Sequence, residues 1–573
     1  MPFQFHNSVF LRCLLFWIAI SINYICHGSI FFVSPNGDDL SGTGSADSPW
    51  RSLHKACEEV KSFGDTIFIK AGIYDEARTS RLARGVSLIG EGSESIITST
   101  TLSREWTPIL DLRSDILENG NQTISYLRFD GSSTTAAQAL WIAKRHNVAI
   151  HDCIFTDFKY TAVLWVGDGG NSGSDPYDKA VYPQHYVTGS RFYNNTVTNC
   201  SLYSDYGRGA LFIGGHEGMV IHNNTISQTE RPDGQNGFPV KAFANGGFMR
   251  GLRIFDNIIT KTDAITWGFA IEGAFFEGCE IFNNKITGAV DINFIKKGGY
   301  DYGLYLHNNI LGPDSISSLP YSGIILEFGV EDVIIERNLI RNCAIGIHHT
   351  MRYPEPWIKR VKVRYNEFSN LGAHGNYHSA LRFGENQNNY IIEDYEIDNN
   401  TFHGNPKTRP YFGLHMRGFE TASDIKVRNN IFMNFSWSWF ESNRGDYFHN
   451  LTIQNNILYK NGNSNSASLN GEPDNMIFSE NMKVNPEICS DYNLRLKPGS
   501  KGIKAGIHIP DQRSDKDGIE PGNPPNVGCY ESIAVDECAN HENKTGPRFA
   551  IVASIFLFSA YIIFQLFKTR KRN

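Results

Sequence analysis

The sequence repeats one four-residue phrase ten times: Asn194-Asn195-Thr196-Val197, Asn223-Asn224-Thr225-Ile226, Asp256-Asn257-Ile258-Ile259, Asn283-Asn284-Lys285-Ile286, Asn308-Asn309-Ile310-Leu311, Arg337-Asn338-Leu339-Ile340, Tyr365-Asn366-Glu367-Phe368, Asn399-Asn400-Thr401-Phe402, Asn429-Asn430-Ile431-Phe432 and Asn455-Asn456-Ile457-Leu458. Successive second Asn residues are separated by 25 residues (284 to 309) to 34 residues (366 to 400). A period in this range indicates a repeat architecture.

Each repeat contains runs of alternating apolar residues, such as Gly-Ile-Ile-Leu-Glu at 323–327 and Val-Ile-Ile-Glu at 333–336. Alternation with period two predicts strands, because a helical repeat would place apolar residues three and four apart. Asn tolerates the left-handed backbone of a tight bend, and stacked Asn amides can form a hydrogen-bonded ladder. The pattern therefore predicts an all-β fold, a right-handed parallel β-helix whose coils rise about 4.8 Å each.

The two ends of the chain differ in composition from the repeats. Residues 1–28 contain a short apolar run after few charges, which predicts a secretory signal peptide, with a retained anchor as the alternative. Residues 549–567 are 19 consecutive residues without charge, long enough for a C-terminal transmembrane helix. Basic residues in the tail, 568–573, favour a cytoplasmic end. We expect a single-pass membrane protein at the cell surface with its repeats outside, or a secreted protein after tail processing.

The segments that flank the repeats carry a family resemblance. Near the start are Phe31-Phe32-Val33-Ser34-Pro35-Asn36-Gly37, Ser48-Pro49-Trp50, an amphipathic segment at 53–61 and Gly64-Asp65-Thr66-Ile67-Phe68-Ile69; near the end are Asp491-Tyr492-Asn493-Leu494 and Gly528-Cys529-Tyr530-Glu531. These closely resemble the opening and closing segments of pectate-lyase-like right-handed β-helix proteins. The resemblance implies a β-helix over 30–531 with a short capping helix, followed by a linker at 532–548. This superfamily includes lyases, hydrolases, epimerases and non-enzymes, so activity must be argued from the site.

Composition excludes some partners. The net charge is −7 and no basic stripe is present, so we expect no nucleic-acid partner. The ten cysteines show no metal-ligand spacing, and Cys200 and Cys343 are expected inside the coil. We expect a monomer and assign no metal ligands; the cofactor stays open, and Asp168, Asp175 and Asp178 in a Gly-rich interruption of the repeat could bind calcium.

Aligning the strand before each Asn phrase by its apolar positions predicts two columns of outward side chains. The first reads Phe212, Lys241, Ala270, Asn293, Ile325, His348, Arg382, His415, Glu441; the second reads Gly214, Phe243, Glu272, Ile295, Glu327, Thr350, Gly384, Arg417, Asn443. Charge is thus concentrated on one face of the central coils. Such a face suits an extended anionic or hydroxyl-rich polymer, with Trp267, Trp357, Phe212 and Phe243 available to stack on sugar rings.

Two chemistries compete for this face. The first is β-elimination on a uronic-acid polymer, with His348 or Lys241 as base and Arg382, His415 and Arg417 neutralising the carboxylate. Asn293, Glu441 and Trp267 would contribute to substrate binding.

The second chemistry is glycoside hydrolysis by Glu272 and Glu327. If both share a column two coils apart, about 9.6 Å separates their backbones, which is compatible with an inverting mechanism. A non-catalytic glycan-binding surface module is the third hypothesis. His349 falls at an inward position and is interpreted as a core residue. Elimination is placed slightly ahead of hydrolysis.

Overall fold

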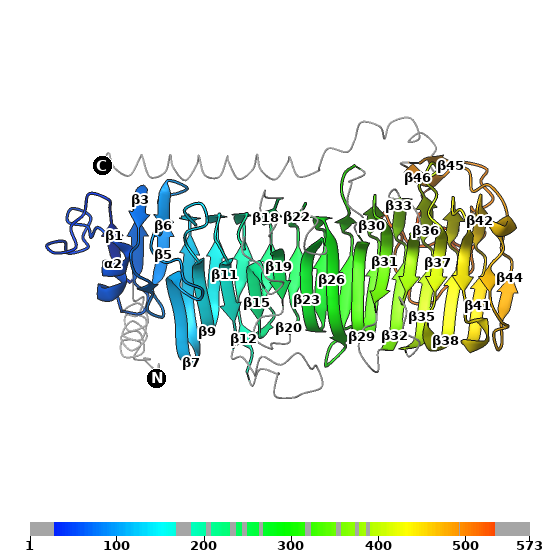
Figure 1. Cartoon of the computed structure of the whole chain (residues 1–573), viewed down its shortest axis with the longest axis horizontal. Helices are drawn as coiled ribbons and strands as arrows, with labels where there is room; N and C mark the ends of the chain where they lie inside the picture. Colours follow the sequence, from blue (N-terminus) through cyan, green and yellow to red (C-terminus); the bar gives the residue numbers. More distant parts are fainter. Residues whose placement is uncertain are drawn as a thin grey trace, which may run out of the picture.

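The chain is an elongated stack of parallel coils in the computed structural model, with the strands of successive coils side by side along its whole length (Figure 1). The structure describes residues 28–167, 185–201, 208–229, 237–242, 249–262, 268–315, 322–350, 357–372, 378–384, 390–491 and 493–532. Nearly all pairings are parallel, so the parallel β-helix implied by the Asn repeat and by the family resemblance is confirmed.

Three faces surround the core, and the first of them carries the candidate site. Its strands are β4 (Ser80–Arg81), β7 (Pro108–Ser125), β9 (Gln138–His151), β11 (Thr161–Val166), β15 (Gly209–Gly214), β19 (Phe238–Ala242), β23 (Phe269–Glu277), β26 (Ala289–Lys296), β29 (Ser322–Glu336), β31 (Ile345–Thr350), β34 (Ser379–Phe383), β37 (Phe412–Met416), β40 (Ser438–Ser442) and β43 (Ser468–Leu469). Strands β7, β9 and β29 are long enough to continue into the second face.

The second face belongs to the same large sheet. Its strands are β1 (Ile30–Val33), β2 (Thr66–Ile69), β5 (Ser87–Gly90), β13 (Arg191–Tyr193), β17 (Val220–His222), β21 (Arg253–Phe255), β24 (Cys279–Phe282), β27 (Leu304–His307), β32 (Trp357–Arg364), β35 (Tyr390–Asp398), β38 (Phe419–Arg428), β41 (Phe448–Gln454) and β44 (Ile477–Ser479). Three short strands lie between the first two faces: β12 (Val187–Thr188), β16 (His216–Glu217) and β20 (Met249–Arg250).

The third face is a separate sheet of 14 short strands. They are β3 (Gly72–Asp75), β6 (Ser95–Thr98), β8 (Arg128–Asp130), β10 (Ile154–Thr156), β14 (Thr196–Thr198), β18 (Thr225–Gln228), β22 (Ile258–Lys261), β25 (Lys285–Thr287), β28 (Ile310–Leu311), β30 (Leu339–Arg341), β33 (Glu367–Leu371), β36 (Thr401–Gly404), β39 (Ile431–Met433) and β42 (Ile457–Tyr459).

The repeated Asn phrase forms the corner between the second and third faces. The second Asn is buried, and its side-chain oxygen accepts from the backbone N–H of the Asn one coil earlier, as between Asn309 and Asn284 at 3.0 Å. The first residue of the phrase takes the left-handed backbone, with φ of 55° at Asn308 and 56° at Arg337. The predicted ladder is therefore confirmed. The first residue of each phrase makes the bend, and the second residue, the buried Asn, makes the ladder.

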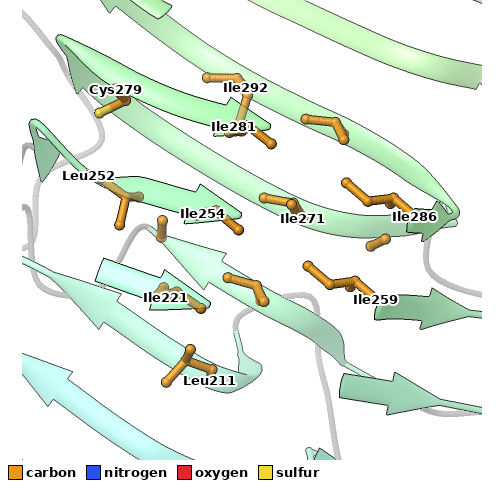
Figure 2. Packing of buried hydrophobic residues seen from close by; sticks show 14 of the residues in the cluster. Leu211, Ile221, Leu252, Ile254, Ile259, Ile271, Cys279, Ile281, Ile286 and Ile292 are labelled. Carbon is orange, nitrogen blue, oxygen red and sulfur yellow. The ribbon is translucent and has the colours of Figure 1, made fainter. Parts of the chain in front are cut away.

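Apolar side chains from all three faces fill the interior in layers. Figure 2 shows one such region, where Ile254 and Ile281 of the second face, Ile259 and Ile286 of the third, and Ile271 of the first point into a common core. Cys200 and Cys343 are buried free thiols, as predicted. Because each coil buries its apolar residues against the next, the stack is one continuous core.

The ends of the stack are closed by different elements. Helix α2 (Leu53–Glu59) begins after the N-cap Ser52 and buries Leu53, Ala56 and Cys57 at the N-terminal end. Near the C-terminus, the antiparallel strands β45 (Ile488–Ser490) and β46 (Asn493–Leu496) precede a closing segment that runs back along the Asn corner. Short 3-10 turns lie at η2 (Gly445–Tyr447) and η3 (Asn463–Asn465).

The closing segment is held by corner side chains from successive coils. Asn455 donates to the carbonyl of Ala505 at 3.0 Å, and Asn429 donates to that of Ile507 at 2.8 Å. Tyr365 donates to the side chain of Gln512 at 2.9 Å. The outward ends of the corner residues thus serve as docking points for the chain's own C-terminal segment.

The predicted signal peptide and the apolar run 549–567 lie outside the described residues, apart from Gly28. Within the described ranges, no helix is long and apolar enough to cross a membrane. The membrane anchor, the domain limits and the monomeric state stay predictions.

Candidate functional site

One line of outward side chains runs along the first face, and strand register fixes its members. We call it the outer column: Asp111, Trp141, Leu164, Phe212, Lys241, Glu272, Asp291, Ile325, His348, Arg382, His415 and Glu441. Each member is paired with the next across neighbouring strands, about 4.8 Å apart. The concentration of charge on the central coils, predicted from the sequence, is confirmed.

A second line of side chains lies two residues further along each strand. It contains Arg113, Ala143, Val166, Gly214, Ala274, Asn293, Glu327 and Thr350. The sequence alignment misplaced four residues on β23 and β26. Ala270 and Ile295 are buried in the core, and Glu272 lies in the outer column and Asn293 in the second column.

The cause of the misplacement is local irregularity. Strand β23 pairs with β26 through a register shift between Phe269 and Ile271, so its inward residues are Ile271 and Gly273. On β26 the inward residues are Val290 and Ile292, because Phe294 takes a left-handed backbone with φ of 52°. Alternation alone fits both alignments, so the sequence carried no signal for Asp291, an acidic column member that the prediction missed.

Lys241 and Glu272 form an ion pair within the outer column. Their side chains are only 5% and 17% exposed, so the pair is largely removed from water. Burial raises the pKa of Glu272, and the ammonium of Lys241 opposes that rise. Lys241 is therefore committed to a carboxylate, which argues against its predicted role as a free general base.

The two carboxylates predicted for hydrolysis do not share a column. Glu272 stands between Lys241 and Asp291, whereas Glu327 stands in the second column and accepts a hydrogen bond from the Thr350 hydroxyl at 2.6 Å. The prediction that paired Glu272 with Glu327 in one column is wrong. The carboxylate that follows Glu272 in the outer column is Asp291, which is buried.

Arg382 occupies the centre of a basic run, with His348 one coil before it and His415 one coil after it. The guanidinium of Arg382 makes no ion pair with a described residue, and its Nε has no hydrogen-bond partner among them. Its side chain is partly exposed, whereas His348 and His415 are buried. An unpaired guanidinium on an outward face is suited to bind a carboxylate or sulfate.

His415, Arg417 and Glu441 form a charged cluster at the C-terminal end of the outer column. Nε2 of His415 lies 3.1 Å from Glu441 Oε2, and Arg417 donates to both oxygens of Glu441 at 3.1 and 2.8 Å. Burial lowers the pKa of His415, with the carboxylate of Glu441 opposing it. Burial alone would raise the pKa of Glu441, but His415 and Arg417 together lower it.

These contacts change two predicted roles. The guanidinium of Arg417 is engaged by Glu441, so it is a poorer neutraliser of substrate charge than Arg382. His415 was expected to be a cationic neutraliser, yet its lowered pKa leaves the imidazole neutral near pH 7 and oriented by a carboxylate. Both ring nitrogens of His415 are buried and make no hydrogen bond of standard geometry in the described ranges; Nε2 is within ion-pair distance of Glu441, which leaves Nδ1 as the nitrogen to take up a proton.

His349 is a core residue, as predicted. Its Nε2 lies 2.9 Å from the Tyr395 hydroxyl, and its ring stacks on Phe383 with centroids 4.7 Å apart. Burial lowers the pKa of His349 to about 3. It therefore stabilises the interior as a neutral ring.

Three parts of the prediction cannot be placed. Trp267, Phe243 and the calcium candidates Asp168, Asp175 and Asp178 all lie outside the described residues. Within the described part of the chain, no group of three or more His, Cys, Asp or Glu side chains is arranged to hold a metal ion. Phe212 does lie in the outer column and packs with Leu164 and Trp141.

Comparison with known proteins gives structural matches only. No protein-family model matches the chain, and no curated protein matches its sequence. A structure of XylC with xylose is 11% identical with a TM-score of 0.37, over 88% of this chain and 98% of that one. The A-module of the mannuronan C-5 epimerase AlgE6 of Azotobacter vinelandii is 12% identical with a TM-score of 0.37, over 74% and 91%.

Proposed function

We propose that this chain is an extracellular enzyme that cleaves an acidic, uronic-acid-containing polysaccharide by β-elimination. The observation that carries the proposal is the unpaired guanidinium of Arg382, next in the outer column to the oriented, neutral imidazole of His415. Elimination needs both groups side by side: a cation for the substrate carboxylate and a base for the neighbouring carbon acid.

The roles follow from the positions in the column. Arg382 binds the C6 carboxylate and stabilises the charge that develops when the C5 proton is removed. Nδ1 of His415 accepts that proton, and Glu441 holds the ring and stabilises the imidazolium. The C4–O4 bond breaks, a C4–C5 double bond forms, and the departing O4 takes up a proton from water. His348, on the other side of Arg382, is placed to contact the adjoining sugar.

The shape of the site suits a polymer better than a small molecule. The outer column extends over twelve coils, with apolar members Trp141, Leu164 and Phe212 followed by charged ones. A rise of about 4.8 Å per coil is comparable to the length of one pyranose ring along a chain. A polysaccharide lying along the column would meet a new side chain at each sugar.

The experiment that tests this proposal is incubation of the protein with a panel of uronic-acid polymers. Ultraviolet absorbance of the unsaturated product reports elimination, and a reducing-end assay on the same samples reports any cleavage. The proposal expects both signals together. New reducing ends without the absorbance would mean hydrolysis, and retained binding without either would mean a glycan-binding module.

Hydrolysis is the second candidate, and one observation favours it. Glu272 and Asp291 are consecutive carboxylates in the outer column, and burial raises the pKa of Glu272, as a general acid requires. Glu272→Gln separates the candidates. It would abolish hydrolysis, whereas elimination at Arg382 and His415, four and five coils away, would continue.

The proposed location remains that predicted from the sequence. A signal peptide at 1–28 and an anchor at 549–567 would place the coils outside the cell, where extracellular polysaccharide is met.

A further inference from the structure

Three phenylalanines on consecutive coils have a backbone conformation that phenylalanine rarely adopts. Phe275, Phe294 and Phe328 have φ of 62°, 52° and 61°, in the left-handed region. Each follows directly after a member of the second column. At the corresponding bend two other coils use glycine, with φ of 70° at Gly215 and 71° at Gly418, and one uses Lys144 with φ of 57°. Bulky side chains are disfavoured in this region, and such strain gathers at functional sites.

The three rings form a stack along the edge of the first face. The centroids of Phe275 and Phe294 are 5.2 Å apart at 7°, and those of Phe294 and Phe328 are 4.9 Å apart at 20°. Phe275 is fully buried, and Phe294 and Phe328 are partly exposed. Beyond them, a Cβ added to Gly329 would lie 3.2 Å from the Trp357 indole, so that ring packs directly on the backbone next to Phe328.

A second aromatic stack in the molecule shows that stacking alone does not require the strained backbone. Tyr193, His222, Phe255, Phe282 and His307 stack along the second face with centroids 4.8 to 5.1 Å apart and nearly parallel planes. None of these five residues has a positive φ. A structural stack is therefore available at ordinary strand positions, and the left-handed placement of Phe275, Phe294 and Phe328 calls for another explanation.

We infer that the exposed edges of Phe294 and Phe328, with Trp357 beside them, form an aromatic wall that packs against the apolar C–H face of a sugar ring. The wall adjoins Asn293 and Glu327, whose side chains supply hydrogen-bonding groups next to it. Phe294 lies three coils and Phe328 two coils before Arg382, so the wall binds sugars near the cleaved bond and leaves that bond itself to Arg382 and His415. This inference rests on the proposed function and deepens it. It selects polymers whose pyranose rings keep an unsubstituted C–H face.

The test compares wild type with three variants. Phe328→Leu removes the ring and keeps an apolar side chain, and Phe328→Tyr keeps the ring. Phe282→Leu removes a ring from the second-face stack. We expect Phe328→Leu to raise KM for the cleaved polymer about 3- to 10-fold with kcat nearly unchanged, since ring contacts are worth that much. Phe328→Tyr and Phe282→Leu should keep the wild-type KM. Equal unfolding midpoints for the two Leu variants would show that stability is not the cause.

Failure of the wall and failure of the proposed function give different results. If Phe328→Leu cleaves the polymer with an unchanged KM, the proposal of an aromatic wall is wrong, and the proposal of β-elimination is unaffected. Affinity electrophoresis through gels containing charged or neutral polysaccharides supplies a readout that needs no cleavage. Retardation of wild type but not of Phe328→Leu supports the wall even if no polymer is cleaved. Equal migration of both proteins in every gel overturns it.

Discussion

Nε2 of His415 lies 3.1 Å from Oε2 of Glu441, and Arg417 donates to both oxygens of the same carboxylate. Glu441 and Arg417 act on the proton affinity of the His415 imidazole in opposite directions. Glu441 raises the pKa of His415, Arg417 lowers it, and burial sets it below the ordinary value. The base proposed for elimination is therefore tuned by two neighbours that can be removed separately.

Replacing Glu441 with Gln removes the group that orients His415. We expect kcat to fall about 100-fold, the lower end of what a positioned base contributes. The acid limb of kcat/KM should move to lower pH, because the pKa of His415 falls when the carboxylate charge is lost. Arg417→Met is the matched control: it removes a positive charge, so the limb should move to higher pH. A pH profile measured on both variants checks this, and shifts in the same direction would contradict the assigned base.

Lys241 and Glu272 should depend on each other for stability. Lys241→Met leaves a buried carboxylate without its partner, which costs about 3–5 kcal/mol of unfolding free energy. Without Lys241 the pKa of Glu272 in the folded protein rises further. A carboxyl group whose pKa is higher in the folded than in the unfolded chain makes the fold less stable as pH rises above the pKa of the unfolded chain. The deficit should therefore be small near pH 4 and grow toward pH 8.

Urea unfolding at both pH values measures this deficit. The double variant Lys241→Met with Glu272→Leu removes the charge as well as its partner and should recover most of the loss. A deficit that is the same at both pH values would show that Glu272 is not the destabilised group.

The two residues of an Asn phrase should tolerate substitution differently. Asn309→Ala deletes the acceptor for Asn284 and three donations of its own, so we expect a loss of about 3 kcal/mol. Asn308 is exposed with φ of 55°, so Asn308→Gly should change stability by less than about 0.5 kcal/mol. Chemical denaturation of both variants decides the matter. Similar losses would mean that the ladder is not what holds the corner.

The neutral core histidine should make the fold sensitive to acid. The pKa of His349 is about 3 when folded, far below its ordinary value, so its stability contribution is present above about pH 6.5 and is lost as pH falls toward 3. His349→Phe combined with Tyr395→Phe removes the titrating group without leaving an unpaired hydroxyl. Thermal unfolding between pH 7 and about pH 4 should show a flatter dependence in the double variant. An identical dependence would place the acid sensitivity elsewhere.

The sequence predicted the fold because the ladder depends on residue identity. Only a buried Asn can accept from the coil before it and donate to the coil after it, so Asn338 and Asn366 had to recur. The bend residue is less restricted, which is why Arg337 and Tyr365 replace Asn there. These two side chains contact the closing segment, a role that no local pattern reveals.

The candidate site was predicted only where strands are regular. From β29 to β40 the alternation of apolar residues placed His348, Arg382, His415 and Glu441 correctly in one column. On β23 and β26 a register shift and a left-handed Phe moved the pattern by two residues, which hid Asp291. The ion pairs within the column could not be predicted from the sequence either, because the sequence does not show that Glu272 neutralises Lys241.

The central claim is that Arg382 binds a substrate carboxylate beside the base His415. Its most direct test is the rate of unsaturated-product formation from a uronic-acid polymer and from the same polymer with its carboxyl groups reduced, for wild type and Arg382→Ala. We predict product from the acidic polymer alone, and a loss of at least about 100-fold in kcat/KM in the variant. Wild-type rates in Arg382→Ala, or no unsaturated product from any uronic-acid polymer with the wild type, would contradict it.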